Sequence, residues 1–337
     1  MSNAASTVEC VTLTDNQPVK KKHIYIYSPS GAVRDKAAFR RGVKRLQSLG
    51  HDVEVDPDAL SSFQRFAGDD ATRLSAIHRA AASGADVALI SRGGYGLTRI
   101  LEHIQYNALA RAIHSGTAFV GMSDFTALQM ALLAKADAPS WAGPALCEGF
   151  GVGGKDIPPV PDDIMEDCFN DMLLGQGEGT GWRQDKKVAH DSTDDGGASQ
   201  ILRIRGGKIW GGNLTMLTTL LGTPFFPKID GGILFLEDVG EHPYRIERMF
   251  SQLLHAGVFS RQKAIVLGQF TSYKLTSHDK GFKFQSVVRW LGQQVKIPVL
   301  TNLPYGHVQT KVLLPVGVSA ELLVDGRDAL LFWGDNA

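Results

Sequence analysis

The chain has 337 residues, of which 43% are hydrophobic, enough for a folded α/β protein of two domains. Lysine plus arginine and aspartate plus glutamate balance at 35 each, so no basic field favours nucleic-acid binding. Cys10, Cys147 and Cys168 lie far apart without CxxC spacing, which argues against a disulfide framework or a zinc site and favours a reducing compartment. No apolar run approaches the ~20 residues that span a bilayer, so no membrane segment is expected.

Strand and helix patterns alternate along the first half, after a tail over residues 1–19 that we exclude from the fold. Such alternation predicts βαβ units and a parallel sheet with helices on both faces, in an N-terminal domain over residues 20–150. Strands are expected at 23–27, 51–55, 85–91 and 118–121. Helices are expected over 39–46 and 71–82, from Leu97 onward, and after Ser123.

The stretch after residue 150 is rich in glycine, proline and polar residues. It predicts a linker over residues 151–181, with one helix over 162–174, before a C-terminal domain over residues 182–337. In that domain we expect strands near 201–204, 208–210, 233–236 and 264–267, helices over 246–254 and 284–295, and closing strands within 312–331.

Ser123 lies where the apolar run Ala118–Gly121 gives way to a helix. A serine on such a turn can present its hydroxyl at the open end of a sheet, beside backbone N–H groups that receive negative charge. This favours a nucleophile. The same letters suit a plain helix N-cap, and the second glycine of the G-x-S-x-G elbow is replaced by Phe125.

Other polar groups also follow apolar strands, where ligands of open α/β sheets bind. They are the loop Arg92–Gly96 after a strand, Glu237 after 233–236, and His307 after 298–300. A histidine can take the proton of a serine hydroxyl while a carboxylate holds the histidine tautomer. The backbone N–H groups of Gly93, Gly94 and Asp124 are candidate donors to an oxyanion.

Each of these residues also has a structural interpretation. The glycine pair at 93–94 fits a tight turn or a phosphate loop, although the spacing matches neither a dinucleotide nor a Walker fingerprint. Asp238 and Glu241 compete with Glu237 for the role of the acid, and His307 is one of ten histidines. The residue pattern alone leaves these alternatives open.

Taken together and in order, the motifs resemble the LD-carboxypeptidase family (muramoyltetrapeptide carboxypeptidases), whose relatives include microcin C self-immunity peptidases. The resemblance runs from Ile24 to about Leu331. The motifs that carry it are Phe66–Asp70, Arg92–Gly96, Gly121–Leu128, Ala142–Pro144, Gly211–Leu214, Leu236–Glu241, Tyr244–Ile246, Gly306–His307 and Leu314–Gly317.

The resemblance implies a flavodoxin-like N-terminal domain, a β-rich C-terminal domain and a serine peptidase with a triad of Ser123, Glu237 and His307. Gly94 and Asp124 would supply the oxyanion donors. Similar enzymes need no metal or other cofactor, form homodimers, and act in the cytoplasm during peptidoglycan recycling. They cleave the amide between the L-centre of a diamino acid and the terminal D-alanine of a murein tetrapeptide.

Substrate recognition is less determined by the sequence. The loop residues Arg92, Gly93 and Tyr95 are candidates for substrate binding, and by charge alone Arg92, Arg245 and Lys311 could receive an anion. Many relatives carry a histidine where this chain has Ala142. The expected substrate is a muropeptide or a small peptide. A peptidyl or aminoacyl nucleotide of the microcin C kind, and a non-catalytic muropeptide-binding protein, are the alternatives.

Overall fold

A computed structural model describes residues 21–153, 161–185 and 201–334 of the chain. The first half forms the parallel sheet that the alternating pattern predicts, with strand order β2-β1-β3-β4-β5, the flavodoxin-like order of a doubly wound fold. Its strands are β1 (His23–Tyr27), β2 (Asp52–Val55), β3 (Val87–Ile90), β4 (Ala118–Gly121) and β5 (Ser140–Ala142). A sixth strand, β11 (Leu314–Val316), comes from the far end of the chain and pairs antiparallel with β5.

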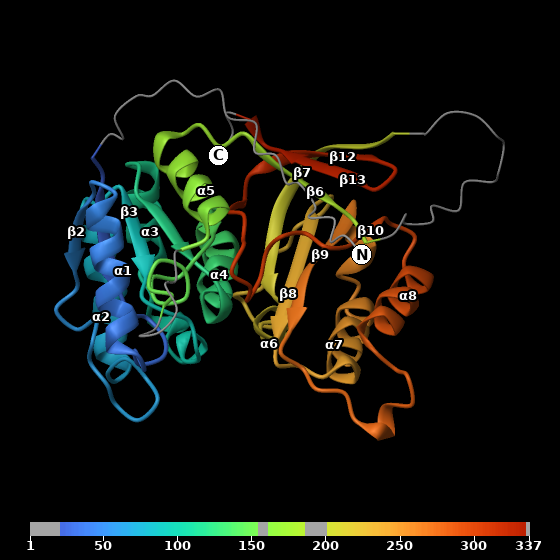
Figure 1. The fold of residues 1–337 in the computed structure, drawn as a ribbon, viewed down its shortest axis with the longest axis horizontal. Helices are drawn as coiled ribbons and strands as arrows, with labels where there is room; N and C mark the ends of the chain where they lie inside the picture. Colours follow the sequence, from blue (N-terminus) through green and yellow to red (C-terminus); the bar gives the residue numbers. More distant parts are fainter. Residues whose placement is uncertain (1–20, 154–160, 186–200, 335–337) are drawn as a thin grey trace, which may run out of the picture.

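Helices cover both faces of this sheet (Figure 1). They are α1 (Lys36–Ser48), α2 (Asp70–Ala82), α3 (Tyr106–His114), α4 (Thr126–Ala136) and α5 (Asp163–Leu174). Aspartates cap the first, second and fifth of them by accepting backbone N–H bonds at the helix start. Helix α4 is buried on nearly every side, because it lies between the two halves of the molecule.

The prediction of a helix from Leu97 is wrong. The structure has two short 3₁₀ turns, Leu97–Arg99 and Leu101–His103, and the helix starts only at Tyr106. The N–H of Leu97 bonds the side chain of Asp124, and Ile104 is extended, so the apolar side chains are buried without a continuous helix. Four apolar positions at helical spacing could not distinguish these turns from an α-helix.

The second half forms a mixed sheet of order β10-β9-β8-β7-β12-β13-β6, in which β7 to β10 run parallel and the rest pair antiparallel. Its strands are β6 (Gly179–Arg183), β7 (Leu202–Asn213), β8 (Ile233–Val239), β9 (Ala264–Thr271), β10 (Val299–Leu300), β12 (Ser319–Asp325) and β13 (Asp328–Phe332). The two short strands predicted at 201–204 and 208–210 are one long strand, β7, which belongs to both the parallel and the antiparallel part. The chain therefore has the predicted fold class, a parallel α/β half and a mixed, β-rich half.

Three helices pack on the second sheet: α6 (Leu214–Thr219), α7 (Pro243–His255) and α8 (Phe284–Gln294). The predicted amphipathic helix is confirmed in α7, which buries Ile246, Phe250 and Leu253 and starts with a proline after its N-cap. Helix α6 was not predicted, although Asn213 caps it in the expected way by accepting the N–H of Met216.

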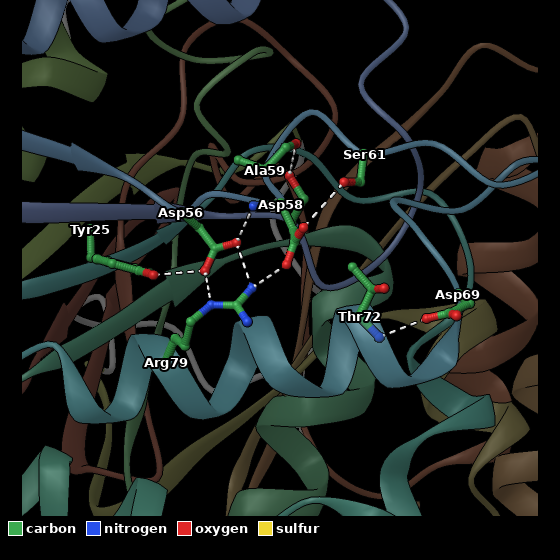
Figure 2. A network of polar contacts seen from close by, with 9 residues as sticks. Tyr25, Asp56, Asp58, Ala59, Ser61, Asp69, Thr72 and Arg79 are labelled. Carbon is green, nitrogen blue, oxygen red and sulfur yellow. Dashed lines mark hydrogen bonds and ion pairs between the residues drawn. The ribbon is translucent and has the colours of Figure 1, made fainter.

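A polar network fastens the edge strand β2 to α2 in the first half (Figure 2). The carboxylate of Asp56, directly after β2, accepts from the Tyr25 hydroxyl at 2.7 Å and from the Arg79 guanidinium at 2.8 and 2.9 Å. Burial alone would raise the pKa of Asp56, but the bonds from Arg79 and Tyr25 outweigh this and hold it below its usual range. Asp58 accepts a further bond from the same guanidinium at 2.7 Å.

One hydrophobic cluster runs through both halves, so they pack against each other as a continuous core. Trp141 of β5 meets Trp333 edge to face at 6.4 Å, close to where β11 joins the first sheet. In the ranges described, no helix is long and apolar enough to cross a membrane. The predicted boundaries of the tail, linker and two domains remain a prediction.

Candidate active site

Ser123 occupies a strained turn between β4 and α4. Its φ is +64°, a left-handed conformation that non-glycine residues adopt at a cost of roughly 1–3 kcal/mol. A helix N-cap is extended instead, and the caps of the 3₁₀ turn and of α4 are Met122 and Phe125, neither of which makes a side-chain capping bond. The capping interpretation of Ser123 is therefore wrong, and the turn resembles a nucleophile elbow in conformation despite Phe125.

The glycine loop after β3 lies directly against this serine. A Cβ added to Gly93 would come within 2.7 Å of Ser123 Cβ and 2.9 Å of Ser123 Oγ, so only glycine allows this approach. Gly94 follows with a φ of +121°, which L side chains rarely adopt. The loop thus brings its backbone beside the Ser123 hydroxyl, which is where an oxyanion would need N–H donors.

The side chain of Asp124, next to Ser123, connects the serine turn to two other loops. Its fully buried carboxylate accepts the Ser30 hydroxyl at 2.5 Å, from the loop after β1, and the N–H of Leu97 at 3.0 Å, at the end of the glycine loop. Burial raises the pKa of Asp124, and these two bonds act against the rise. The side chain of Asp124 therefore fixes the glycine loop relative to the serine turn, while its backbone N–H remains a separate candidate donor.

Glu237 and His307 meet in the second half. Glu237, in the last part of β8, is fully buried and accepts from His307 Nδ1 at 2.8 Å, a contact between residues 70 apart in sequence. Gly306 has a φ of +139°, and a Cβ there would lie 3.1 Å from Glu237 Oε2, so glycine lets the histidine loop cross over the acid. The contact leaves Nε2 as the free nitrogen of the imidazole.

The carboxylates around His307 increase its affinity for a proton. Burial lowers the pKa of His307, but the hydrogen bond and charge of Glu237, together with Asp238 and Glu148, outweigh it and raise the pKa above its usual value. The imidazolium form is therefore stabilised, as general-base catalysis requires after proton transfer.

Asn213 connects this acid–base pair to the serine turn. Its amide nitrogen donates to Glu237 Oε1 and Asp238 Oδ1, each at 3.1 Å, and its backbone N–H donates to Thr126 Oγ1 at 3.0 Å. Thr126 is the first residue of α4, three positions after Ser123. A chain of contacts thus leads from the serine turn through Asn213 to Glu237 and His307.

Asp238, a competitor for the acid role by sequence, has other partners. Its Oδ2 accepts the N–H and the hydroxyl of Thr215 at 2.9 and 2.8 Å. Burial and the neighbouring charge of Glu237 raise the pKa of Asp238 to about 6. Of the two adjacent carboxylates, Glu237 is the one that contacts His307.

The structure thus brings Ser123, Gly93 and Gly94 together on one side and Glu237 and His307 on the other. No hydrogen bond of the Ser123 hydroxyl occurs among the described residues. Contacts between nucleophile and base are commonly long in unliganded enzymes and tighten when substrate binds.

Two predicted substrate-binding residues, Arg92 and Tyr95, contact neither Ser123 nor His307 by a hydrogen bond among the described residues. Arg92 donates to the carbonyl of Ala32 at 3.3 Å and lies 3.6 Å from Glu148 Oε1. Tyr95 is 41% exposed, and its ring packs against the buried ring of Phe66 with the ring centroids 5.8 Å apart.

Sequence reasoning missed Asn213 and Glu148 as parts of the site. The Gly211–Leu214 motif had pointed to the region of Asn213, but an asparagine before a helix indicates only a cap. Glu148 carried no signal of its own, because it follows a short strand in a loop without periodicity.

Comparison with known proteins matches both halves of the chain to the domains of one family. The LD-carboxypeptidase N-terminal domain matches residues 24–143, and the LD-carboxypeptidase C-terminal domain matches residues 206–322. A crystal structure of muramoyltetrapeptide carboxypeptidase from Oxalobacter formigenes superposes with a TM-score of 0.78 at 38% identity, covering 93% of this chain and 98% of that one.

More distant relatives cover most of the chain as well. The murein tetrapeptide carboxypeptidase of Pseudomonas aeruginosa is 26% identical over 91% of this chain and 94% of its own length. The microcin C7 self-immunity protein of Escherichia coli is 28% identical over 70% of each chain. On the two domain matches and the similarity to the Oxalobacter structure, the chain belongs to the LD-carboxypeptidase family, peptidase S66.

Proposed function

We propose that this protein is a serine carboxypeptidase that removes the terminal D-alanine from murein tetrapeptides, by cleaving its amide to the L-centre of a diamino acid. The observation that carries the proposal is the contact of His307 with the buried Glu237, linked through Asn213 to a serine held at positive φ. The named activities of the Oxalobacter and Pseudomonas relatives supply the substrate class.

In the proposed acylation step, Ser123 Oγ attacks the scissile carbonyl carbon and passes its proton to His307 Nε2. Glu237 holds the Nδ1 proton and stabilises the imidazolium. The N–H groups of Gly94 and Asp124 receive the negative charge on the carbonyl oxygen. The loss of one such donor typically costs about 10²–10³ in rate.

The acyl-enzyme then forms and breaks with the same groups. The carbon–nitrogen bond breaks as His307 gives its proton to the leaving nitrogen, which releases D-alanine and leaves the peptide as an ester on Ser123. A water molecule attacks this ester while His307 takes one of its protons. The ester bond then breaks as His307 gives that proton to Ser123 Oγ, which regenerates the serine hydroxyl and releases the shortened peptide as its acid. No net proton is gained or lost by the three residues.

The same proposal places the enzyme in peptidoglycan recycling in the cytoplasm, as a homodimer, with Arg92, Gly93 and Tyr95 at the substrate. These assignments follow the family resemblance.

The direct test is incubation with UDP-MurNAc-tetrapeptide and measurement of free D-alanine. We expect release by the wild type, and loss of at least about 10³-fold in kcat with Ser123→Ala. Full activity of that variant would overturn the role of Ser123. Hydrolysis of a peptidyl nucleotide without D-alanine release would instead favour the microcin-type substrate. Tight muropeptide binding without any turnover would indicate a binding protein.

A further inference from the structure

Lys311 is a buried lysine near the proposed base. It lies four residues after His307, in the loop that leads into β11, and its side chain and backbone together are only 2% exposed. Within the described ranges its ammonium makes no hydrogen bond or ion pair. Lysine is almost never fully buried unless it is paired, because removing an ammonium from water costs several kcal/mol. An ammonium that lacks a partner, on a lysine buried this deeply, therefore points to a ligand that is anionic.

The carboxylates whose charges reach Lys311 each have other donors. They are Glu148, Glu237 and Asp162. Glu237 is held by His307 and Asn213, Asp162 accepts from Met165 and Thr310, and Glu148 lies beside Arg92. Burial lowers the pKa of Lys311, and these three charges act against the decrease.

The position of Lys311 also matches the chemistry of a carboxypeptidase. The terminal carboxylate of a peptide is two bonds from the scissile nitrogen. The group that protonates that nitrogen must therefore lie within a few ångströms of the group that binds the carboxylate. His307 and Lys311 share one loop, closed by the Val312 N–H to Pro304 carbonyl bond of 2.8 Å, and the charge of Glu148 reaches both of them.

We propose that the Lys311 ammonium binds the terminal carboxylate of the peptide substrate and so restricts cleavage to the last residue. Arg92 and Arg245 are less suited, because Arg92 already contacts Ala32 and Glu148, and Arg245 lies on the exposed start of α7 beside Glu241. This inference rests on the proposed function for the identity of the peptide, but the carboxylate site can be tested without turnover.

The test compares UDP-MurNAc-tetrapeptide with the same compound carrying a C-terminal carboxamide. An ionic hydrogen bond contributes about 1.5–3 kcal/mol, or about 10- to 150-fold. We expect Lys311→Met to lower kcat/KM for the acid by this factor and to change that for the amide less than about threefold. Lys208→Met, which removes a surface lysine paired with Asp137 at 2.7 Å, is the matched control and should not discriminate.

Stability separates a binding role from a structural one. Because methionine is only one atom shorter than lysine and the substitution removes an unpartnered charge, Lys311→Met should unfold at the same or a higher urea concentration than the wild type. A variant that is less stable and loses activity equally on acid and amide would overturn the proposal. So would a wild type that hydrolyses the amide as well as the acid.

Binding to Ser123→Ala, measured by calorimetry, distinguishes failure of this inference from failure of the proposed function. If no D-alanine is released but Lys311→Met weakens binding of the acid alone by tenfold or more, the carboxylate site stands without the peptidase activity. If D-alanine is released and Lys311→Met affects acid and amide alike, the function stands and this inference falls. If the protein shows no turnover and no binding of the peptide, both the proposed function and this inference are refuted.

Discussion

Replacing Asn213 tests how the buried carboxylates of the site are held. Its amide nitrogen donates to Glu237 and Asp238 at 3.1 Å, and all three residues are 5% exposed or less. A hydrogen bond to a charged group contributes about 1.5–3 kcal/mol, so Asn213→Ser should lower the free energy of unfolding by about 3–6 kcal/mol while both acids are ionised. Serine retains a side-chain oxygen to cap α6, so the main change is the loss of the amide donor to the two carboxylates.

The decrease in the free energy of unfolding caused by Asn213→Ser should depend on pH, because Asp238 titrates. Its folded pKa of about 6 exceeds the usual 3.9 or so of an unfolded chain, so the native state binds more protons between about pH 4 and 6. The stability that this group contributes therefore falls as the pH rises through that window. Asn213→Ser removes a donor to the ionised form and raises this pKa further. The stability gap between variant and wild type should thus widen from pH 5 to pH 8.

Urea unfolding at the two pH values measures the difference in stability between variant and wild type. D-alanine release, assayed under conditions where both proteins are folded, measures the effect on the site. We expect at least a tenfold decrease in kcat/KM, because Glu237 loses the contact that positions it against His307. Thr218→Val, in the same helix, removes a neutral hydroxyl and should cost about 1 kcal/mol at both pH values without loss of activity. A variant as stable as the wild type, or a gap independent of pH, would refute the reasoning.

Three further changes have defined outcomes. Glu148→Gln removes a charge that raises the pKa of His307, so the acid limb of the kcat/KM profile should move to lower pH; a limb that stays in place contradicts this. Asp124→Ala leaves two donors without their buried acceptor and loosens the glycine loop, so D-alanine release should fall about 10- to 100-fold, whereas full activity would show that Asp124 does not position this loop. Arg79→Met removes the cation of buried Asp56 and should cost about 3–5 kcal/mol in urea unfolding at unchanged kcat/KM; a cost below about 1 kcal/mol would show that the network in Figure 2 is not stabilising.

The alternation of strands and helices was enough to predict the fold class, because hydrophobic periodicity reports burial directly. It could not separate the turns at Leu97 from a helix, nor find β6 in a segment rich in glycine. Whether β7 was one strand or two depended on its partners, β8 and β12, which periodicity does not contain.

For the site, the sequence indicated Ser123, Glu237 and His307 one by one, because each of them follows an apolar strand. Their spatial relation was not contained in local sequence, because the 2.8 Å contact joins residues 70 apart and the close approach of Gly93 to Ser123 links two separate loops. Asn213 and Glu148 are defined by their contacts alone, which is why a single sequence did not reveal them. The catalytic roles remain our proposal.

The return of β11 to the first sheet has a consequence for biosynthesis. That strand lies 172 residues beyond its partner in β5, as the pairing of Leu314 with Ala142 shows. At a synthesis rate of about 5–20 residues per second, β5 remains an open edge for about 10–30 s after it has been made. Unpaired edges recruit other strands, so nascent chains are exposed to misassembly during this interval. The loop with His307 is synthesised just before the strand that closes the edge, and assembly of the proposed site therefore coincides with the end of this vulnerable period.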